Sequence, residues 1–282
     1  MGTLYVVATP IGNLSDFSLR AIETLKHSDL ILVEDTRQTI KLLNHFDIKT
    51  KMLSYHKFNE KERVDSIISN LKDGKNISLV SDAGTPCISD PGYILVKAAR
   101  KNKIDVIGVP GASAVITALS VGGLDTSSFA FYGFVPTDKK GKEELFNNIK
   151  TSNIKTKVVY ESPKRILRFL EELKHEMPGC VVSICSELTK IHEKCIFGDI
   201  DAVYSELKSD SNAEKGEYVV LISNEVEKKD EIDTSIESKL VDIMVKEEKT
   251  IKEAVDILNN TNKNLRKKDI YNAGLNLKNI IK

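Results

Sequence analysis

The sequence predicts an α/β protein with two lobes and a small helical domain after them. Three observations carry this prediction: two successive series of short β-branched runs, amphipathic stretches between the runs, and a purely helical pattern after a charged segment. Strands that alternate with helices form crossover units, which build largely parallel sheets with ligand sites at the carboxyl ends of the strands. A chain of 282 residues, 41% hydrophobic and 29% charged, has the composition of a globular protein of this size.

The two series of runs predict two lobes that meet near residue 122. The first lobe, residues 1–121, has expected strands at 4–8, 30–33, 77–80 and 104–109. The second lobe, residues 122–223, follows Gly122 and Gly123, and its expected strands are 128–132, 157–160, 181–185 and 218–222. Helical patterns fall at residues 142–150 and 163–174 of this second lobe.

The part of the chain after the second lobe differs in composition. Residues 224–233 are charged and poor in apolar side chains, which favours a solvated linker over a core segment. Residues 234–282 then predict a small helical domain, because their apolar residues recur at helical spacing. The three expected faces are Ile236, Leu240, Ile243 and Met244; Ile251, Ala254, Val255 and Leu258; and Leu265, Ile270, Ala273 and Leu277.

Charge and cysteine usage exclude several classes of protein. Lys plus Arg and Asp plus Glu both number 41, so the net charge is zero and any contact with nucleic acid must be local. The four cysteines have neither CxxC spacing nor histidines at metal-ligand intervals, which argues against a metal site and a disulfide framework. No basic segment with a long apolar core opens the chain, so we expect a soluble cytoplasmic protein without a membrane partner.

Three loops at the ends of predicted strands hold the candidate ligand site. Residues 8–14 contain Pro and Gly, which force a tight turn. Residues 81–86 follow an apolar strand, and Asp82 in this loop either binds a ligand hydroxyl or amine or caps a turn. Residues 109–114 open a helix whose free N–H groups face the strand ends, with Ser113 as a capping residue in the alternative interpretation.

Nucleotide-binding signatures are missing from these loops. No Gly-Lys-Ser/Thr follows a glycine loop and no GxGxxG opens the first crossover, which disfavours nucleotide hydrolysis and hydride transfer. A crevice lined by small residues suits a ligand held by backbone groups. S-adenosylmethionine is such a ligand.

Six short motifs in series make the sequence resemble a known family. They are Thr9-Pro10-Ile11-Gly12-Asn13-Leu14, Glu34-Asp35-Thr36-Arg37, Ser81-Asp82-Ala83-Gly84-Thr85-Pro86, Pro110-Gly111-Ala112-Ser113-Ala114, Gly133-Phe134-Val135-Pro136 and Glu161-Ser162-Pro163-Lys164-Arg165. In this order they resemble the ribosomal RNA small subunit methyltransferase I family of the tetrapyrrole-methylase superfamily. The resemblance covers about residues 3–222 and implies two α/β lobes of the tetrapyrrole-methylase type, followed by a small tail domain.

The resemblance also implies an activity, a cofactor and partners. The expected reaction is S-adenosylmethionine-dependent 2′-O-methylation of a cytidine, position 1402, in the 16S rRNA of the small ribosomal subunit. Dimers are usual in the family, so a homodimer is expected. The implied contacts of the methyl donor are Pro10, Asp82, Ala83, Gly84, Thr85, Gly111, Ala112, Ser113 and Ala114.

Carboxylates near these loops are candidates for accepting the proton of the ribose hydroxyl. Glu34, Asp35 and Glu161 are the catalytic candidates besides Asp82. An ion pair between the acids at 34–35 and Arg37, which merely fixes the loop, is an equally open interpretation. The expected substrate contacts on the two lobes are Arg37, Lys164 and Arg165. The family pattern has His at position 164 and Arg at Ser186, and both differences bear on the substrate side of the site.

A basic stretch in the tail is the expected RNA contact. Residues 263–282 hold Lys263, Arg266, Lys267, Lys268, Lys278 and Lys282 against Asp269, a local charge of +5. Lys267 and Lys268 are the chosen contacts, although a solvated helix face would have the same composition. Two other functions stay open, a methylase of a corrin or porphyrin ring and a non-catalytic RNA-binding module. The motif at 34–37 disfavours the first, and the intact loops at Asp82 and Ser113 disfavour the second.

Overall fold

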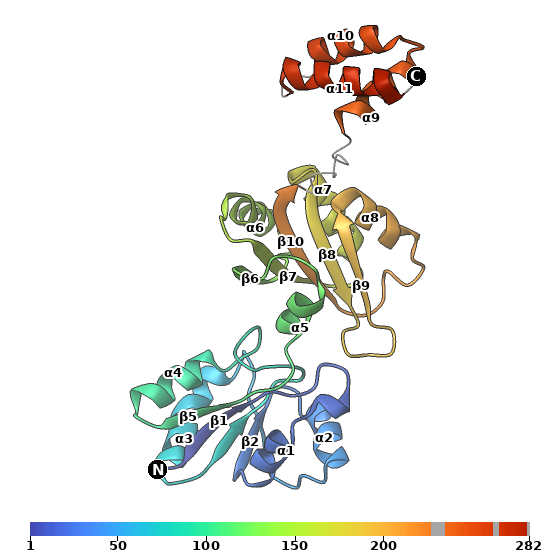
Figure 1. Ribbon diagram of the computed structural model, residues 1–282. Coiled ribbons are helices and arrows are strands. Elements are labelled where there is room, and N and C mark those ends of the chain that lie inside the picture. Colours follow the sequence, from blue (N-terminus) through green and yellow to red (C-terminus); the bar gives the residue numbers. More distant parts are fainter. Residues whose placement is uncertain (227–234, 262–264, 281–282) are drawn as a thin grey trace. The chain divides into compact units, whose positions relative to one another are not determined.

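The computed structural model describes residues 1–226, 235–261 and 265–280 (Figure 1). The chain divides into two compact units, Met1–Glu227 and Lys228–Lys282. Two five-stranded sheets lie in the first unit, and three helices form the second. No helix among the described residues is both long and apolar enough to cross a membrane.

The first sheet is parallel and has helices on both faces (Figure 1). Its strand order is β3-β2-β4-β1-β5. All four expected strands are present, and the short edge strand β3 was not expected. The strands are β1 (Thr3–Val7), β2 (Leu30–Val33), β3 (Met52–Ser54), β4 (Ile77–Leu79) and β5 (Asp105–Val109). A 3-10 turn, η1 (Leu14–Asp16), follows β1.

Apolar side chains of both faces of this sheet pack against helices. One core joins the sheet to α3 (Glu60–Lys72) and α4 (Tyr93–Lys101). The other joins it to α1 (Leu19–Lys26) and α2 (Thr36–His45). Because both faces are covered, strands such as β2 are apolar at nearly every position, as is typical of parallel sheets.

The second sheet is mixed rather than parallel. Its order is β6-β7-β10-β8-β9, and only the pair β6 and β7 is parallel. The reason is the connection of β8 to β9, a hairpin without a helix, which reverses the chain. Four of these strands were expected from the sequence, and β9 was not. The strands are β6 (Phe129–Phe134), β7 (Thr156–Glu161), β8 (Cys180–Ser186), β9 (Lys194–Asp199) and β10 (Tyr218–Val226).

Helices cover the two faces of the second sheet unequally. One face packs against α6 (Lys139–Thr151), α7 (Ile166–Glu176) and α8 (Ile200–Ser209). The opposite face packs against α5 (Ala114–Val121), which connects the two sheets.

Strand β10 extends three residues into the segment expected as a linker. The side chain of Asn224 donates hydrogen bonds of 3.3 Å to the carbonyls of Ile149 and Lys150 at the end of α6. Val226 pairs with Cys180 of β8 after a register shift, so residues 224–226 belong to the sheet. The rest of the expected linker, residues 227–233, lies outside the described residues.

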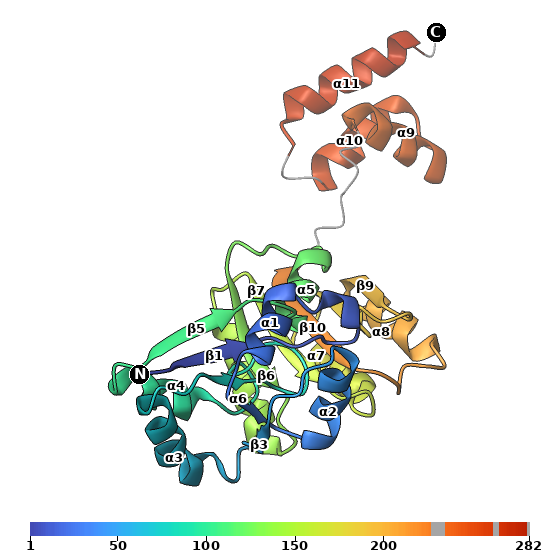
Figure 2. The same ribbon diagram turned by 90° about the horizontal axis from the view of Figure 1, so that it is seen from below.

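The second unit is a three-helix bundle (Figure 2). Its helices are α9 (Ile236–Lys246), α10 (Ile251–Thr261) and α11 (Lys267–Ile280). All twelve residues of the three predicted apolar faces belong to one core, six of them buried and six partly buried. Helical periodicity alone thus identified this core correctly.

Candidate active site

Three loops of the first sheet are tied together at the carboxyl ends of their strands. The backbones of Thr9 and Gly84 exchange two hydrogen bonds, of 2.9 and 3.0 Å, which join the loops after β1 and β4. The hydroxyl of Thr85 donates 3.1 Å to the carbonyl of Ala112, which joins the loops after β4 and β5. Gly84 has a φ of +80°, a left-handed conformation that glycine adopts without strain. Because β4, β1 and β5 are neighbours in the sheet, these loops form one continuous edge.

A cavity of about 420 Å³ lies along this edge. Its volume falls in the range of small-molecule sites. The first lobe and the start of α5 contribute Ile11, Glu34, Asp82, Ala83, Gly84, Thr85, Ile88, Ser89, Asp90, Ser113 and Ala114. The second lobe contributes Phe134, Tyr160, Glu161, Ser162, Pro163, Glu217, Tyr218 and Val219.

Six of the nine expected donor contacts line this cavity. They are Asp82, Ala83, Gly84, Thr85, Ser113 and Ala114. Pro10, Gly111 and Ala112 are not among the lining residues. A Cβ on Gly111 would lie 3.0 Å from the Cβ of Ala8, so this glycine permits close packing on the end of β1. Ser113 also has its alternative role, since its hydroxyl accepts from the N–H of Ile116 at 3.5 Å and caps α5.

Asp35 and Arg37 form a local ion pair outside the cavity lining. The Asp35 carboxylate accepts from the Arg37 backbone at 2.8 Å, caps α2, and lies 2.7 Å from the Arg37 guanidinium. Hydrogen bonds from Arg37 lower the pKa of Asp35 to about 2. A carboxylate with so low a pKa is a poor proton acceptor, and this arrangement matches the interpretation that the pair fixes the loop.

Three of the acids that line the cavity, Glu34, Asp82 and Asp90, have raised pKa values. Burial is the main cause that raises the pKa of Glu34, and the neighbouring carboxylates of Asp90 and Asp82 raise it further. Burial likewise raises the pKa values of Asp82 and Asp90. Asp82 accepts a hydrogen bond of 3.1 Å from the backbone of Asp35, so it also holds the neighbouring loop. Raised carboxyl pKa values in a cavity are typical of functional sites.

Glu161 enters the cavity from the end of β7 with its side chain only 2% exposed. Its Oε1 lies 2.6 Å from the Arg165 guanidinium and accepts from the Ser162 backbone at 2.6 Å. The Nε of Arg165 donates 2.9 Å to the hydroxyl of Ser162. Arg165 therefore positions Glu161 through two of its guanidinium nitrogens, while its buried Nη1 has no hydrogen-bond partner among the described residues. Its expected contact with the substrate stays a prediction.

Two other expected substrate contacts on the first unit, Lys164 and Arg37, are exposed and are not among the residues that line the cavity. Lys267 and Lys268 are exposed on α11 of the second unit. Ser186 ends β8, where its hydroxyl donates 3.4 Å to the carbonyl of Lys194.

Sequence reasoning missed several lining residues. Asp90 lies in the run Ser89-Asp90-Pro91-Gly92, and the available signal was a second acid-bearing turn eight residues after Asp82. Tyr160, directly before Glu161, has its pKa raised to about 12 by burial. Phe134 and Tyr160 stack edge to face with ring centroids 5.2 Å apart and form an aromatic wall.

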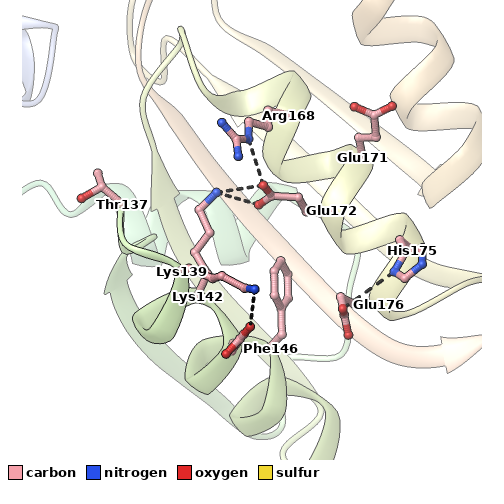
Figure 3. Close-up of a pocket in the computed structure, with 10 residues that line it drawn as sticks. Thr137, Lys139, Lys142, Phe146, Arg168, Glu171, Glu172, His175 and Glu176 are labelled. Atoms are coloured by element: carbon pink, nitrogen blue, oxygen red, sulfur yellow. Dashed lines mark hydrogen bonds and ion pairs between the residues drawn. The ribbon is translucent and has the colours of Figure 1, made fainter.

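A second hollow, of about 600 Å³, lies between α6 and α7 (Figure 3). Its charged side chains pair with one another: Lys142 and Arg168 both contact Glu172, at 2.7 and 3.0 Å. Lys139 lies 3.8 Å from Glu143. Because most charged side chains of this hollow pair with one another, we interpret it as a structural ion-pair network. In the described parts of the chain, no group of three or more His, Cys, Asp or Glu is placed to hold a metal ion.

Comparison with known proteins decides the family. The family model of tetrapyrrole (corrin/porphyrin) methylases matches residues 3–204. Ribosomal RNA small subunit methyltransferase I of Halalkalibacterium halodurans is 47% identical over 227 residues, 80% of this chain and 78% of the relative. The protein of the same name from Buchnera aphidicola is 39% identical over 96% of this chain and 94% of the relative. The chain belongs to the ribosomal RNA small subunit methyltransferase I family.

Solved structures share the fold at low sequence identity. Diphthine synthase matches with a TM-score of 0.61 and 13% identity, covering 79% of this chain and 90% of that one. Uroporphyrin-III C-methyltransferase from Thermus thermophilus, solved with S-adenosylhomocysteine, matches with a TM-score of 0.53 and 17% identity, covering 79% and 97%. The tetrapyrrole-methylase fold and the S-adenosylmethionine cofactor expected for this methyltransferase are confirmed.

Proposed function

We propose that this methyltransferase transfers the methyl group of S-adenosylmethionine to the ribose 2′-oxygen of a cytidine, position 1402, in the 16S rRNA of the small ribosomal subunit. The observation that carries the proposal is the cavity in which the tied strand-end loops meet Tyr160 and Glu161 of the second lobe. Relatives named as small-subunit rRNA methyltransferases, at 39–47% identity, favour ribosomal RNA over a porphyrin ring as the substrate.

The residues of the cavity fit the chemistry of the donor. S-adenosylmethionine carries a positive sulfonium and an ammonium group, and Glu34, Asp82 and Asp90 offer carboxylates to such cations. Gly84 and Ala83 line the cavity with little or no side chain, so a ligand can approach the backbone of this loop closely. A Cβ on Gly84 would also crowd the Ile11 side chain, at 3.3 Å. We assign donor binding to these loops.

When bound, S-adenosylmethionine supplies the methyl group as a sulfonium substituent. The chain's own task is to align the ribose hydroxyl, exclude water and take the hydroxyl proton. Glu34 suits the last role better than Asp35, since burial raises its pKa whereas hydrogen bonds from Arg37 lower that of Asp35. Glu161, held by Arg165 and by the Ser162 backbone, is positioned to orient a substrate hydroxyl.

We further propose that the second unit helps to dock the ribosomal RNA, through Lys267 and Lys268 at the start of α11. The protein is proposed to act as a homodimer. Ile88 and Phe134, 56% and 60% exposed, line the cavity and would be partly covered by a partner subunit. Sedimentation equilibrium of the purified protein tests the dimer.

The experiment that tests the reaction uses donor with a labelled methyl group and small ribosomal subunits from cells that lack this modification. We expect one labelled 2′-O-methylcytidine per subunit after nuclease digestion. Label on another nucleotide, or label on a base, would refute the assignment. Transfer to a porphyrin but not to the subunits would establish the alternative substrate.

A further inference from the structure

Helix α11 presents an exposed face that is both basic and aromatic. Lys267, Lys268, Tyr271, Leu275 and Lys278 are all exposed, with Tyr271 61% and Leu275 45% accessible. Their spacings of three and four residues place them on one side of the helix. The opposite side, with Ile270, Ala273 and Leu277, is buried in the bundle core.

The positive charge of this face is uncompensated within the described residues. No ion pair there engages Lys267, Lys268 or Lys278, whereas Lys246 of the same unit lies 3.1 Å from Asp242. Asp269 is the one acid among the described residues of α11. It is one position from Lys268 and two from Lys267, and residues one or two apart on a helix do not face each other. Lys267 and Lys268 lie one helical turn before Tyr271, and Lys278 lies one turn after Leu275.

This combination differs from an ordinary solvated helix face. Lysines alone would be explained by solubility, but a large aromatic ring that is 61% exposed among them adds a stacking surface, which solubility does not require. Aromatic rings between basic side chains are the usual platform for single-stranded nucleic acid, because bases stack on the ring while lysines contact phosphates. From Lys267 to Lys278 the helix rises about 16 Å, enough for several nucleotides to pass over Tyr271.

We propose that this face of α11 binds single-stranded RNA, with Tyr271 as the stacking platform for a base and Lys267, Lys268 and Lys278 as phosphate contacts. The proposal rests on the ribosomal RNA substrate inferred above and assigns to the tail a contact beyond the basic charge. A protein partner that docks by apolar contact on Tyr271 and Leu275 is the competing occupant.

The test measures binding of the full chain to a fluorescein-labelled oligocytidylate of about 15 nucleotides by fluorescence anisotropy at low salt. The variants are Tyr271→Leu, which keeps apolar area but removes the ring, and Tyr271→Trp, which keeps a stacking surface. Stacking contributes about 1–3 kcal/mol per base, so Tyr271→Leu should weaken binding at least about fivefold, while Tyr271→Trp should retain it. Tyr271 is exposed, so both variants should keep the parental circular dichroism spectrum.

The phosphate contacts have a matched control. Lys267→Ala should reduce the slope of log affinity against log salt by about 0.7, the value for one phosphate of a single strand. Lys252→Ala, an exposed lysine on α10 with the same change in charge, should leave the slope unchanged. Equal effects of the two variants would show that net charge alone attracts RNA and would overturn the proposal.

The proposal would also be overturned if Tyr271→Leu bound RNA as tightly as the parent protein. It would be overturned as well if Tyr271→Trp bound RNA as weakly as Tyr271→Leu. Methyl transfer to small subunits by the parent protein is measured alongside. Its failure would refute the proposed function. Normal transfer with unchanged affinity of Tyr271→Leu would refute only the role of the α11 face.

Discussion

Replacing Glu34 by glutamine should slow methyl transfer about a hundredfold or more, because the amide cannot accept the ribose proton. A hundredfold loss corresponds to about 2.7 kcal/mol of transition-state stabilisation. The measurement is the single-turnover rate at saturating donor, so that weaker donor binding does not mimic a slower chemical step. In the parent protein the rate should fall as pH falls through the raised pKa of Glu34, since only the carboxylate accepts a proton. The Gln variant should lose that limb of the pH profile.

Although Glu34→Gln should slow methyl transfer, it should not lower the stability of the folded protein at pH 7. Burial raises the folded-state pKa of Glu34 above its unfolded value, so its contribution to stability is present below the unfolded pKa and is lost as pH rises through the folded pKa. At pH 7 the parent thus holds a destabilising carboxylate that Glu34→Gln removes. We expect a thermal midpoint at or above that of the parent at pH 7, with the difference shrinking toward pH 4.

Asp35→Asn is the matched control for Glu34→Gln. Asparagine still caps α2, and the loss is confined to the exposed ion pair with Arg37. Its single-turnover rate should decline far less. Equal losses in the two variants would show that the loop position matters and not proton acceptance. Parental rates in both would leave alignment, with water as the proton acceptor, as the surviving mechanism.

Three further outcomes are expected. Gly84→Val should abolish donor binding in calorimetry, because it forces a β-branched residue to a φ of +80°. Gly111→Val should abolish donor binding and also lower the thermal midpoint, because its Cβ would lie 3.0 Å from the Cβ of Ala8 at the end of β1. Unchanged stability of Gly111→Val would contradict the packing role of this glycine. Cys195 is exposed, and the neighbouring Cys185 thiol lowers its pKa. Iodoacetamide should therefore modify Cys195 before the other cysteines, and Cys185→Ala should slow that reaction. Leu258→Ala should destabilise the tail bundle by about 2–5 kcal/mol, seen as faster proteolysis after residue 227, with donor affinity unchanged.

The sequence predicted those features that depend on local spacing. Helical periodicity identified all twelve core residues of the tail, and apolar runs identified eight strands. The two missed strands are edge strands: β3 has three residues, none fully buried, and β9 buries only Ile196. A strand with one covered side has a weak apolar pattern, so it resembles a loop in the sequence.

Parts of the site escaped prediction because they depend on which segments meet in space. The rule that ligands bind at strand ends found the loops around Asp82 and Ser113. The rule did not extend to Asp90, whose turn lies beyond the Asp82 loop, and it gave no means to see that Arg165 would turn back to Glu161 at the start of α7. The Cys185 and Cys195 pair, ten residues apart, is likewise set by the register of β8 with β9 and not by a motif.

Three acids of the cavity, Glu34, Asp82 and Asp90, link the binding of a positively charged ligand to the conformation of the surrounding loops. Burial raises the pKa values of Glu34, Asp82 and Asp90, and the Asp82 carboxylate raises those of the other two further. Their charged forms therefore oppose folding and are better accommodated with a cation among them. The sulfonium and ammonium groups of the donor are such cations. Asp82 also accepts a hydrogen bond from the backbone of Asp35, so the charge state of the proposed donor site and the position of the loop that carries Glu34 are linked through one carboxylate. Binding of the donor should therefore favour both the ionised form of Glu34 and the loop conformation in which that carboxylate faces the substrate hydroxyl.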